Sequence, residues 1–344
     1  MLFDPRPKTS RRDLFNREEE LALLDNAARR GEPLILVLGI RRVGKTSLLR
    51  SFLEEWRGIH IDMRGVKNLA ELYNRIGEGL STHIDKFMNI IKNIRGIRVH
   101  GAEVEIRWHG RDSISLVGLL EELNRRGGRT ILIFDEAQLI RPPISTEIKR
   151  AIAYAYDNLE NITVILSGSE VGLLRDFIGV DNPESPLYGR YAVELVVDRF
   201  SPTLSREFLE TGFREQGVSP DRDLIEKAVE IFDGIVGWLV YFGKSYIDGL
   251  RDLNHILDIA IRLATREIEK LSTREKLVLK AIAEGANTWS SVRRYLEEKE
   301  GVTVPKSTLT RIIKKLEKLS LIQDYKFLDP IYSQAAKRLK TRSI

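Results

Sequence analysis

Short apolar runs alternate with amphipathic stretches through the first 200 residues of the chain. The runs that read as β-strands are 34–39, 59–63, 130–136, 162–169 and 192–197. The first, third and fourth are almost continuously apolar, as expected of strands covered on both faces. Strands that alternate with helices are typical of a parallel sheet flanked by helices. The pattern therefore predicts an α/β domain.

A long insertion separates the second run from the third. It begins with apolar positions at helical spacing from Leu69 to Leu80. It then alternates apolar and polar residues between Ile97 and Trp108, with Gly101 near the middle. Alternation on both sides of a glycine predicts a small hairpin insertion at about 94–110.

The rest of the chain divides into two helical segments. The first shows helical spacing throughout, interrupted by Gly234 and Gly237, and predicts an α-helical subdomain. The second is a short basic module with three helical patterns and an alternating segment at 321–328. We therefore expect domain boundaries that give the segments 1–200, 201–270 and 271–344.

Composition supports a folded protein and excludes some chemistry. The chain has 344 residues, of which 42% are hydrophobic, enough for a core in each segment. The net charge is only +5, so any basic patch must be local. The absence of cysteine excludes disulfides, thiolate nucleophiles and cysteine zinc sites. The histidines show no metal-ligand spacing and read as structural or surface residues: His60, His83, His100, His109 and His255.

No segment of the sequence predicts membrane insertion or export. The first fifteen residues include basic side chains but no apolar run of a signal peptide. No stretch reaches the roughly 18 apolar residues of a membrane span. We expect a soluble, cytoplasmic protein with no membrane partner.

A complete phosphate-binding pattern follows the first predicted strand and leads into a helix. The pattern G-x-x-x-x-G-K-[ST] is filled by Gly39, Ile40, Arg41, Arg42, Val43, Gly44, Lys45 and Thr46, with Ser47 next. Its glycines allow tight curvature, so that backbone N–H groups converge on phosphate oxygens at a helix N-terminus. In such loops the lysine reaches the β- and γ-phosphates and the hydroxyl holds Mg²⁺. The motif predicts ATP or ADP binding with Mg²⁺.

An acidic pair ends the third predicted strand. Asp135 is placed to hold the magnesium, directly or through water, and Glu136 to polarise an attacking water. By itself an acidic strand end is more often a solvated turn. Together with the phosphate loop upstream, it favours ATP hydrolysis.

Two further groups have open interpretations. Ser167 and Ser169 end the fourth predicted strand, where hydroxyls would sense the γ-phosphate or the water. Ser169 also reads as a helix-capping residue, and we favour the sensor role for Ser167. Arg190 is a candidate for stabilising the transferred phosphate, in its own chain or in a neighbouring one, and equally reads as a surface arginine.

These motifs together resemble the archaeal ATPase family, a STAND-type branch of the AAA+ P-loop NTPases, over nearly the whole chain. The resemblance rests on Phe15-Asn16-Arg17 with the acidic run after it, the loop with its Arg41-Arg42 pair, Asp135–Gln138, Ser167–Ser169, Leu187–Arg190 and Asp329-Pro330.

The resemblance implies a five-stranded parallel sheet in the order 5-1-4-3-2, a helical lid and a C-terminal winged helix. It also implies that Phe15, Asn16 and Arg17 lie near the adenine and that Gln138 lies beside the catalytic carboxylates. One departure concerns the lid, where the family usually carries Gly-x-Pro and this chain has Val236 in place of the proline. Val236 still offers an apolar surface to the base, without the rigidity of proline.

The C-terminal module contains one strongly amphipathic helix. Its pattern starts at Ser307 and places Leu309, Ile312, Ile313 and Leu316 on one side. A basic face over 311–318 is left outside, with Arg311, Lys314, Lys315 and Lys318. In a winged helix this face would enter a DNA major groove. Docking to a protein partner and a merely solvated face remain alternatives.

Three hypotheses follow for the whole chain. The leading one is an ATP-binding and ATP-hydrolysing switch whose nucleotide state moves the winged helix. The second is a DNA-binding regulator in which ATP is mainly a structural ligand. The third is a processive oligomeric motor, which only Arg190 favours, as a residue acting on a neighbouring subunit.

Overall fold

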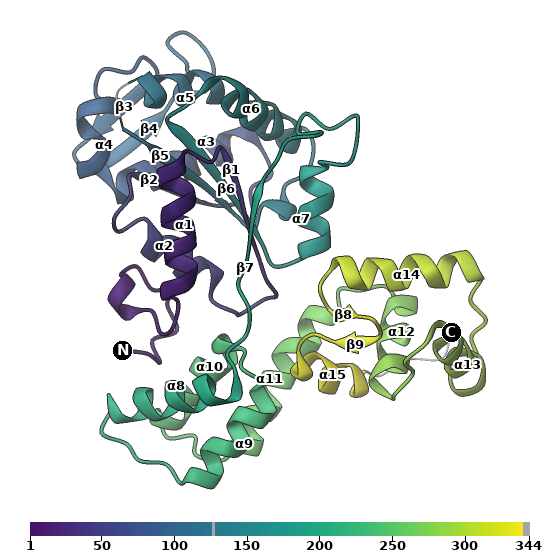
Figure 1. Cartoon of the computed structure of the whole chain (residues 1–344). Coiled ribbons are helices and arrows are strands. Elements are labelled where there is room, and N and C mark those ends of the chain that lie inside the picture. The colour runs from purple at the N-terminus through teal and green to yellow at the C-terminus, as the bar shows by residue number, and fades with distance from the viewer. Residues whose placement is uncertain (126–127, 340–344) are drawn as a thin grey trace.

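The computed structural model describes residues 1–125 and 128–339. They form a five-stranded parallel sheet (Figure 1) in the order β2-β5-β6-β1-β7. Its strands are β1 (Leu34–Leu38), β2 (Gly58–Asp62), β5 (Thr130–Asp135), β6 (Ile162–Gly168) and β7 (Val193–Val196). Because β3 and β4 belong to the insertion, these are core strands one to five. The sheet therefore has the expected order 5-1-4-3-2, read from the opposite edge.

Alternation along β1 explains how helices cover both faces of the sheet. Ile35 and Val37 pack with α1 (Glu18–Arg30) and α2 (Lys45–Phe52) on one face. Leu36 and its even-numbered neighbours face the other side, where they share a core with α3 (Leu69–Thr82), α5 (Leu116–Arg125), α6 (Ile144–Asn158) and α7 (Val171–Ile178). Every residue of β1, β5 and β6 is buried, as the apolar runs predict.

The insertion contains the expected hairpin. After α4 (Ile84–Ile91), β3 (Ile97–His100) pairs antiparallel with β4 (Glu103–Ile106). Gly101 in the turn has a φ of +63°, a conformation that glycine adopts without strain. Two short 3₁₀ helices lie elsewhere in the core, at Arg11–Asp13 and Ala137–Leu139.

A four-helix lid follows β7. It consists of α8 (Pro202–Arg214), α9 (Arg222–Phe232), α10 (Val236–Ile247) and α11 (Leu253–Ile268). Gly234 turns the chain between α9 and α10 with a φ of +70°, and a Cβ there would lie 1.9 Å from the carbonyl oxygen of Phe200. This close approach ties the lid to the segment that leaves the sheet.

The C-terminal module has the three helices and small hairpin of a winged helix. Its elements are α12 (Thr273–Ala283), α13 (Trp289–Lys299), α14 (Lys306–Lys318), β8 (Ile322–Gln323), β9 (Lys326–Phe327) and α15 (Pro330–Lys337). The expected amphipathic helix is α14, which begins one residue earlier than predicted. The lid and this module share one hydrophobic core. We propose domain boundaries between β7 and α8 and between α11 and α12.

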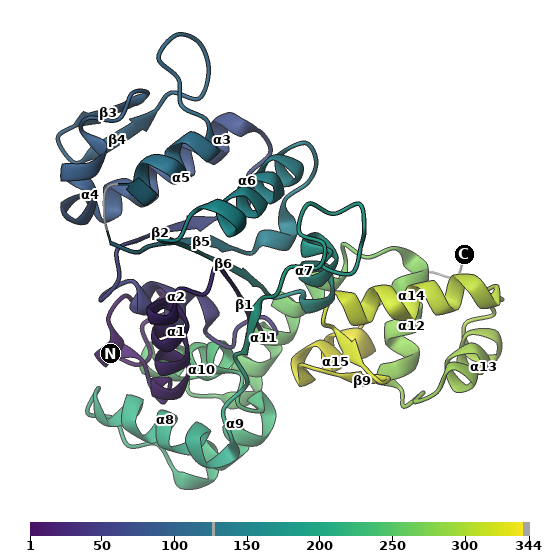
Figure 2. The ribbon, with the colours of Figure 1, turned by 45° about the horizontal axis from the view of Figure 1, so that its top comes forward.

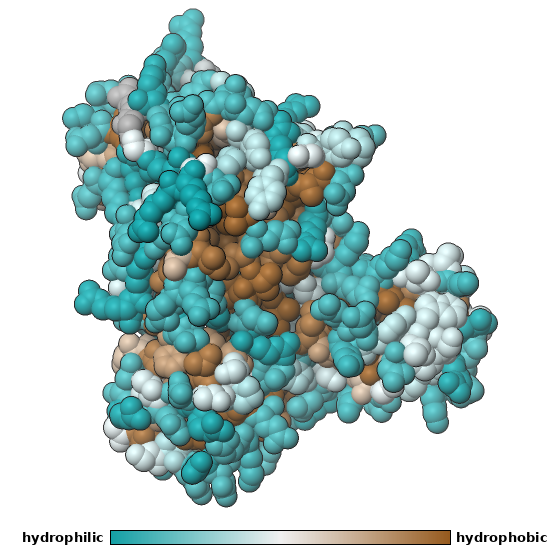
Figure 3. Space-filling model, viewed as in Figure 1, coloured by the Kyte–Doolittle hydropathy of each residue, from teal (hydrophilic) through white to brown (hydrophobic). Residues whose placement is uncertain are grey.

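Figure 1 separates the core from the lid and the winged helix, and the turned view in Figure 2 shows α7 beside α14. Hydrophilic residues cover most of the face in Figure 3, and apolar residues gather near β7. β7 is an edge strand, and its Val196 is 61% exposed. In the described part of the chain, no helix combines the length and apolar character needed to cross a membrane.

Candidate active site

A cavity of about 680 Å³ lies where the sheet, the N-terminal segment and the lid meet. Its polar end is lined by Gly44, Lys45, Thr46 and Glu136, and its apolar end by Phe15, Phe200, Phe208 and Val236. A nucleotide needs this combination, because its phosphates require N–H donors and cations while its base packs on apolar surfaces.

The phosphate loop has the curved backbone that its glycines predict. Gly39 and Gly44 have φ values of +152° and +97°, and a Cβ on Gly39 would lie 2.4 Å from the carbonyl oxygen of Val197. Arg42 also has a positive φ, +68°. α2 begins at Lys45, so the loop ends at a helix N-terminus, which attracts anions.

Lys45 is almost completely buried inside this loop. Its Nζ donates hydrogen bonds to the carbonyl oxygens of Gly39 (2.8 Å) and Ile40 (2.9 Å). Burial lowers the pKa of Lys45 to about 8, against the opposing attraction of Glu136 and Asp135. The side chain therefore presents a poorly solvated cation to the polar end of the cavity.

Thr46 and Asp135 meet across the loop and the strand end. The Thr46 Oγ1 donates to the Asp135 Oδ2 at 2.7 Å, and the Ser167 hydroxyl donates to the Asp135 Oδ1. Burial opposes ionisation of Asp135, but His60 and these two hydroxyls outweigh it and hold its pKa well below the usual range. The donors are a hydroxyl and an ionised carboxylate, hard oxygen ligands of the kind that Mg²⁺ prefers. Thr46 and Asp135 would hold Mg²⁺, with water completing its shell.

Glu136 adopts the left-handed conformation, with a φ of +58°. Its Oε2 accepts hydrogen bonds from the Gln138 Nε2 (2.6 Å) and the Ser169 Oγ (2.7 Å). Backbone strain at a non-glycine residue is typical of functional sites. Gln138 lies beside the carboxylate as the resemblance implies. The two serines divide their contacts, because Ser167 binds Asp135 and Ser169 binds Glu136.

The segment expected near the adenine borders the same cavity. Phe15 and Arg17 line it, whereas Asn16 and Ile40 are not among its lining residues. Arg17 donates to the carbonyl oxygens of Val43 (3.1 Å) and Asp198 (2.7 Å) and so fixes the N-terminal segment to the loop. Val236 lies opposite, 3.5 Å from where a Cβ on Gly44 would be.

The loop arginines point toward the lid and the winged helix. Arg41 pairs with Glu170 (2.7 Å) and Glu267 (3.0 Å). Arg42 pairs with the same Glu267 at 2.6 Å and donates to the Tyr332 hydroxyl at 3.1 Å. Tyr332 in turn donates to Glu267. The phosphate loop is thereby joined to α11 and α15.

Comparison with known proteins agrees with this geometry. Residues 14–242 match a family described as an ATPase domain predominantly from Archaea. The chain belongs to this family. Residues 269–332 of this archaeal ATPase match the C-terminal winged helix-turn-helix domain of MCM proteins. Membership establishes a P-loop ATPase that hydrolyses ATP.

Solved structures include a similar protein over the full length. A Walker-type ATPase of Pyrococcus abyssi is 40% identical, with a TM-score of 0.86, 98% of this chain covered and 100% of the other. The Thermotoga maritima RuvB Holliday junction branch migration motor is 16% identical, with a TM-score of 0.47 and coverages of 94% and 93%. Aeropyrum pernix Orc1 in complex with DNA is 21% identical, with a TM-score of 0.44 and coverages of 90% and 84%. No curated protein matches the sequence.

Sequence reasoning overlooked one residue at the archaeal ATPase site. His60 on β2 lies with its Nε2 3.3 Å from the Asp135 Oδ2. This buried nitrogen has no hydrogen bond of good geometry among the described residues. Only the strand order could have indicated this role of His60, because β2 pairs with β5 and brings His60 next to the strand that carries Asp135.

Arg190 lies away from this cavity. It pairs with Asp157 at 2.6 Å, stacks over Tyr156 and donates to the Pro186 carbonyl oxygen. It is not among the residues that line the cavity. In this chain the structure therefore does not bring Arg190 to the phosphate loop, and a role toward a neighbouring subunit stays a prediction.

Proposed function

We propose that this ATPase is a molecular switch of the STAND type within the AAA+ class, in which the bound nucleotide sets the position of the winged helix. The observation that carries the proposal is the contact network from Arg41 and Arg42 to Glu267 and Tyr332. Through this network, the phosphate loop also contacts α11 and α15.

The residues at the polar end of the cavity have distinct roles in hydrolysis. Lys45 would bind the β- and γ-phosphates, and Thr46 and Asp135 would hold a Mg²⁺ ion, which would supply positive charge to those phosphates. Glu136 orients and polarises the attacking water, and Ser169 fixes the direction of its carboxylate. Ser167 does the same for Asp135.

Nucleotide changes the balance of charge around the loop arginines. Phosphate groups compete with Glu267 for the two guanidinium groups, because both arginines line the cavity. Each partly exposed ion pair contributes about 1 kcal/mol or less. Several contacts that break together can therefore change the equilibrium constant between the closed and open arrangements by about tenfold to a hundredfold. ATP and ADP would differ because they differ in the γ-phosphate.

Glu136→Gln tests the assignment of the base. This variant keeps the size and the hydrogen-bond acceptor of the side chain but removes its charge. We expect ATP binding by calorimetry to be unchanged and phosphate release to be lost. Normal phosphate release by Glu136→Gln would contradict the assignment.

Glu267→Gln tests the switch. We expect this variant to weaken both arginine contacts and to give α15 faster amide exchange without nucleotide, as the ATP state does in the wild type. Glu269→Gln, two residues further along and outside the network, serves as the matched control. If a non-hydrolysable ATP analogue leaves exchange in α15 unchanged in the wild type, the nucleotide does not move the winged helix.

A second candidate function is a DNA-binding regulator in which ATP is mainly a structural ligand. The observation in its favour is the exposed basic face of α14, and a protein partner there is the remaining alternative. The two candidates differ in whether affinity for DNA depends on the nucleotide. A gel shift with duplex DNA at low salt, with ATP analogue, ADP or neither, separates them.

A further inference from the structure

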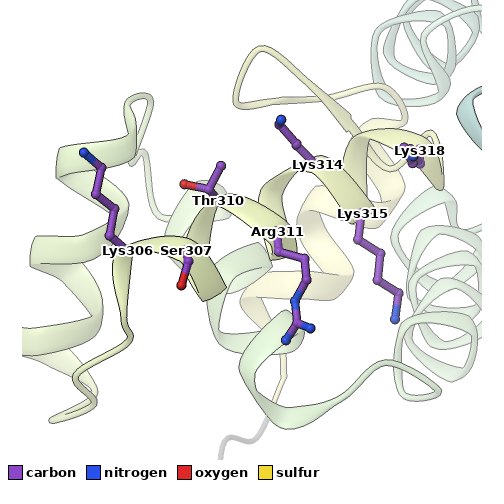
Figure 4. A pocket seen from close by; sticks show the side chains of 7 residues that line it. All are labelled: Lys306, Ser307, Thr310, Arg311, Lys314, Lys315 and Lys318. Atoms are coloured by element: carbon purple, nitrogen blue, oxygen red, sulfur yellow. The ribbon is translucent and has the colours of Figure 1, made fainter.

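The outer face of α14 is a basic groove of about 890 Å³ (Figure 4). It is lined by Lys306, Ser307, Thr310, Arg311, Lys314, Lys315 and Lys318, with no acidic side chain among them. The apolar side of the helix is buried in the winged-helix core, so these cations face outward. Such a face complements a row of phosphates.

The two ends of this face differ in their ion pairs. Lys315 pairs with Glu275 and Lys318 with Asp176, each at 2.7 Å. Within the described ranges, Lys306, Arg311 and Lys314 form no ion pair and are exposed. The N-terminal part of α14 therefore has cations available for a ligand, whereas carboxylates partly neutralise the C-terminal end.

The ATPase core covers that C-terminal end. α7 lies beside it in both ribbon views (Figures 1 and 2). A Cβ on Gly172 would lie 2.5 Å from the Lys318 Cα, and the Val171 N–H donates to the Ser320 Oγ at 2.9 Å. The backbones of α7 and α14 pack closely here, so α7 occupies space that a ligand on this end of α14 would need.

The same end of α7 starts at the nucleotide site. Glu170, directly before α7, pairs with Arg41 of the phosphate loop, and Ser169 contacts Glu136. The consecutive residues 169–172 therefore run from the contacts with Glu136 and Arg41 to the contact with α14. These four residues therefore connect the site of the γ-phosphate to the surface of α14.

We propose that duplex DNA binds the basic face of α14 through its phosphates and that α7 masks one end of this face. The inference rests on the proposed switch, because the binding of ATP is what moves α7. When Arg41 turns to the phosphates, Glu170 loses its partner and α7 separates from α14. The core and the DNA thus compete for the same helix end, and ATP decides between them.

Gly172→Ala tests the mask directly. Alanine favours the helix that contains it but forces α7 away from the Lys318 backbone. The measurement is fluorescence anisotropy of a labelled 20-base-pair duplex with the full chain at low salt. We expect Gly172→Ala to bind about tenfold more tightly than the wild type without nucleotide. A non-hydrolysable ATP analogue with Mg²⁺ should tighten the wild type and leave Gly172→Ala unchanged.

Two controls define the surface. Gly118→Ala makes the same change in α5, where the new Cβ meets only side chains of neighbouring residues at 3.3 Å or more, and should bind like the wild type. Arg311→Gln with Lys314→Gln should lose affinity in both the wild-type and Gly172→Ala backgrounds, with a salt slope reduced by about two.

Each contrary result overturns a stated part of the proposal. Equal affinity of Gly172→Ala and the wild type in every nucleotide state removes the mask. Undiminished binding by the double glutamine variant removes the surface, and tighter binding to single-stranded RNA removes the partner. ATP turnover is measured in parallel: if it still requires Glu136, the hydrolytic part of the proposed function stands, whereas turnover independent of Glu136 contradicts that part instead.

A cross-link gives a second measurement that does not depend on weakening the contact. The chain has no cysteine, so Asp176→Cys with Lys318→Cys places two unique thiols across α7 and α14. Joining them with a short bismaleimide should weaken duplex binding in the presence of the ATP analogue by about tenfold relative to the unjoined protein. Equal affinity of the joined and unjoined proteins with the analogue would show that α7 does not mask the face.

Discussion

The Thr46 hydroxyl donates a 2.7 Å hydrogen bond to the carboxylate of Asp135, which lies 89 residues further along the chain. The contact places a helix N-terminus and a strand end around one point. Both residues present oxygen atoms there, so one divalent ion can contact both.

Thr46→Val should therefore uncouple the nucleotide from magnesium. The substitution keeps the shape of the side chain and removes the hydroxyl, so Mg²⁺ loses one ligand. We expect turnover to fall at least about a hundredfold, since metal contacts contribute several kcal/mol to phosphoryl transfer. Calorimetry with ADP should show that Mg²⁺ no longer increases affinity. Thr82→Val, whose hydroxyl bonds only the Glu78 carbonyl on α3, is the control. Magnesium-dependent affinity in Thr46→Val would contradict the assignment.

Local pattern predicted the parts of this site that lie within single motifs. The apolar runs located the core strands, and the phosphate loop and Asp135 were recognisable from their own neighbours in sequence. His60 was not, because its role depends on which strand pairs with β5. The partners of Arg41 and Arg42 were not predictable either, since Glu267 and Tyr332 lie more than 200 residues away. Contacts between domains leave no periodic signal in the sequence.

Nucleotide affinity should fall at alkaline pH because Lys45 has a pKa of about 8 in the folded chain, below the 10.5 of an exposed amine. Bound phosphates favour the protonated form, so binding above pH 8 requires uptake of a proton. We expect uptake of about one proton at pH 9 and none at pH 7. Calorimetry in two buffers of different ionisation enthalpy measures this number.

The contribution of Lys45 to the stability of the fold changes with pH in the opposite direction to the nucleotide affinity. Between pH 8 and 10.5 the unfolded chain binds the proton of Lys45 more strongly, so this group's contribution to stability rises with pH in that window. Lys45→Met should abolish both effects. Equal proton uptake at pH 7 and 9 in the wild type would show that another group is responsible.

The left-handed backbone at Glu136 should affect the free energy of unfolding of variants at this position. Glu136→Ala and Glu136→Gly remove the same side-chain hydrogen bonds, but only glycine adopts a φ of +58° without strain. We expect the glycine variant to be more stable than the alanine variant by about 1 kcal/mol in urea unfolding. The same pair at Glu207, in α8, should show the reverse order. A more stable alanine variant at position 136 would indicate that the strain is absent.

Asp329 links the start of α15 to the lid. Its Oδ2 accepts from the indole N–H of Trp238 in the lid and its Oδ1 from the N–H of Ile331 in the first turn of α15, each at 2.8 Å. Asp329→Ala leaves a buried donor and a helix end without partners, which costs about 2–4 kcal/mol. We expect a lower melting temperature and faster amide exchange in α15, with exchange in α6 unchanged.

Asp329→Asn tests the hydrogen bond to the first turn of α15, because asparagine keeps one acceptor oxygen but loses the charge and the second acceptor that Trp238 uses. Burial raises the pKa of Asp329, against the opposing hydrogen bonds from Trp238 and Ile331, so ionisation of this carboxyl costs the folded state stability. Asparagine keeps an acceptor for the first turn of α15 and should therefore be much closer to the wild type than alanine. If both variants destabilise the protein equally, the hydrogen bond to Ile331 is secondary to the contacts of the carboxylate with Trp238, Arg42 and Arg199.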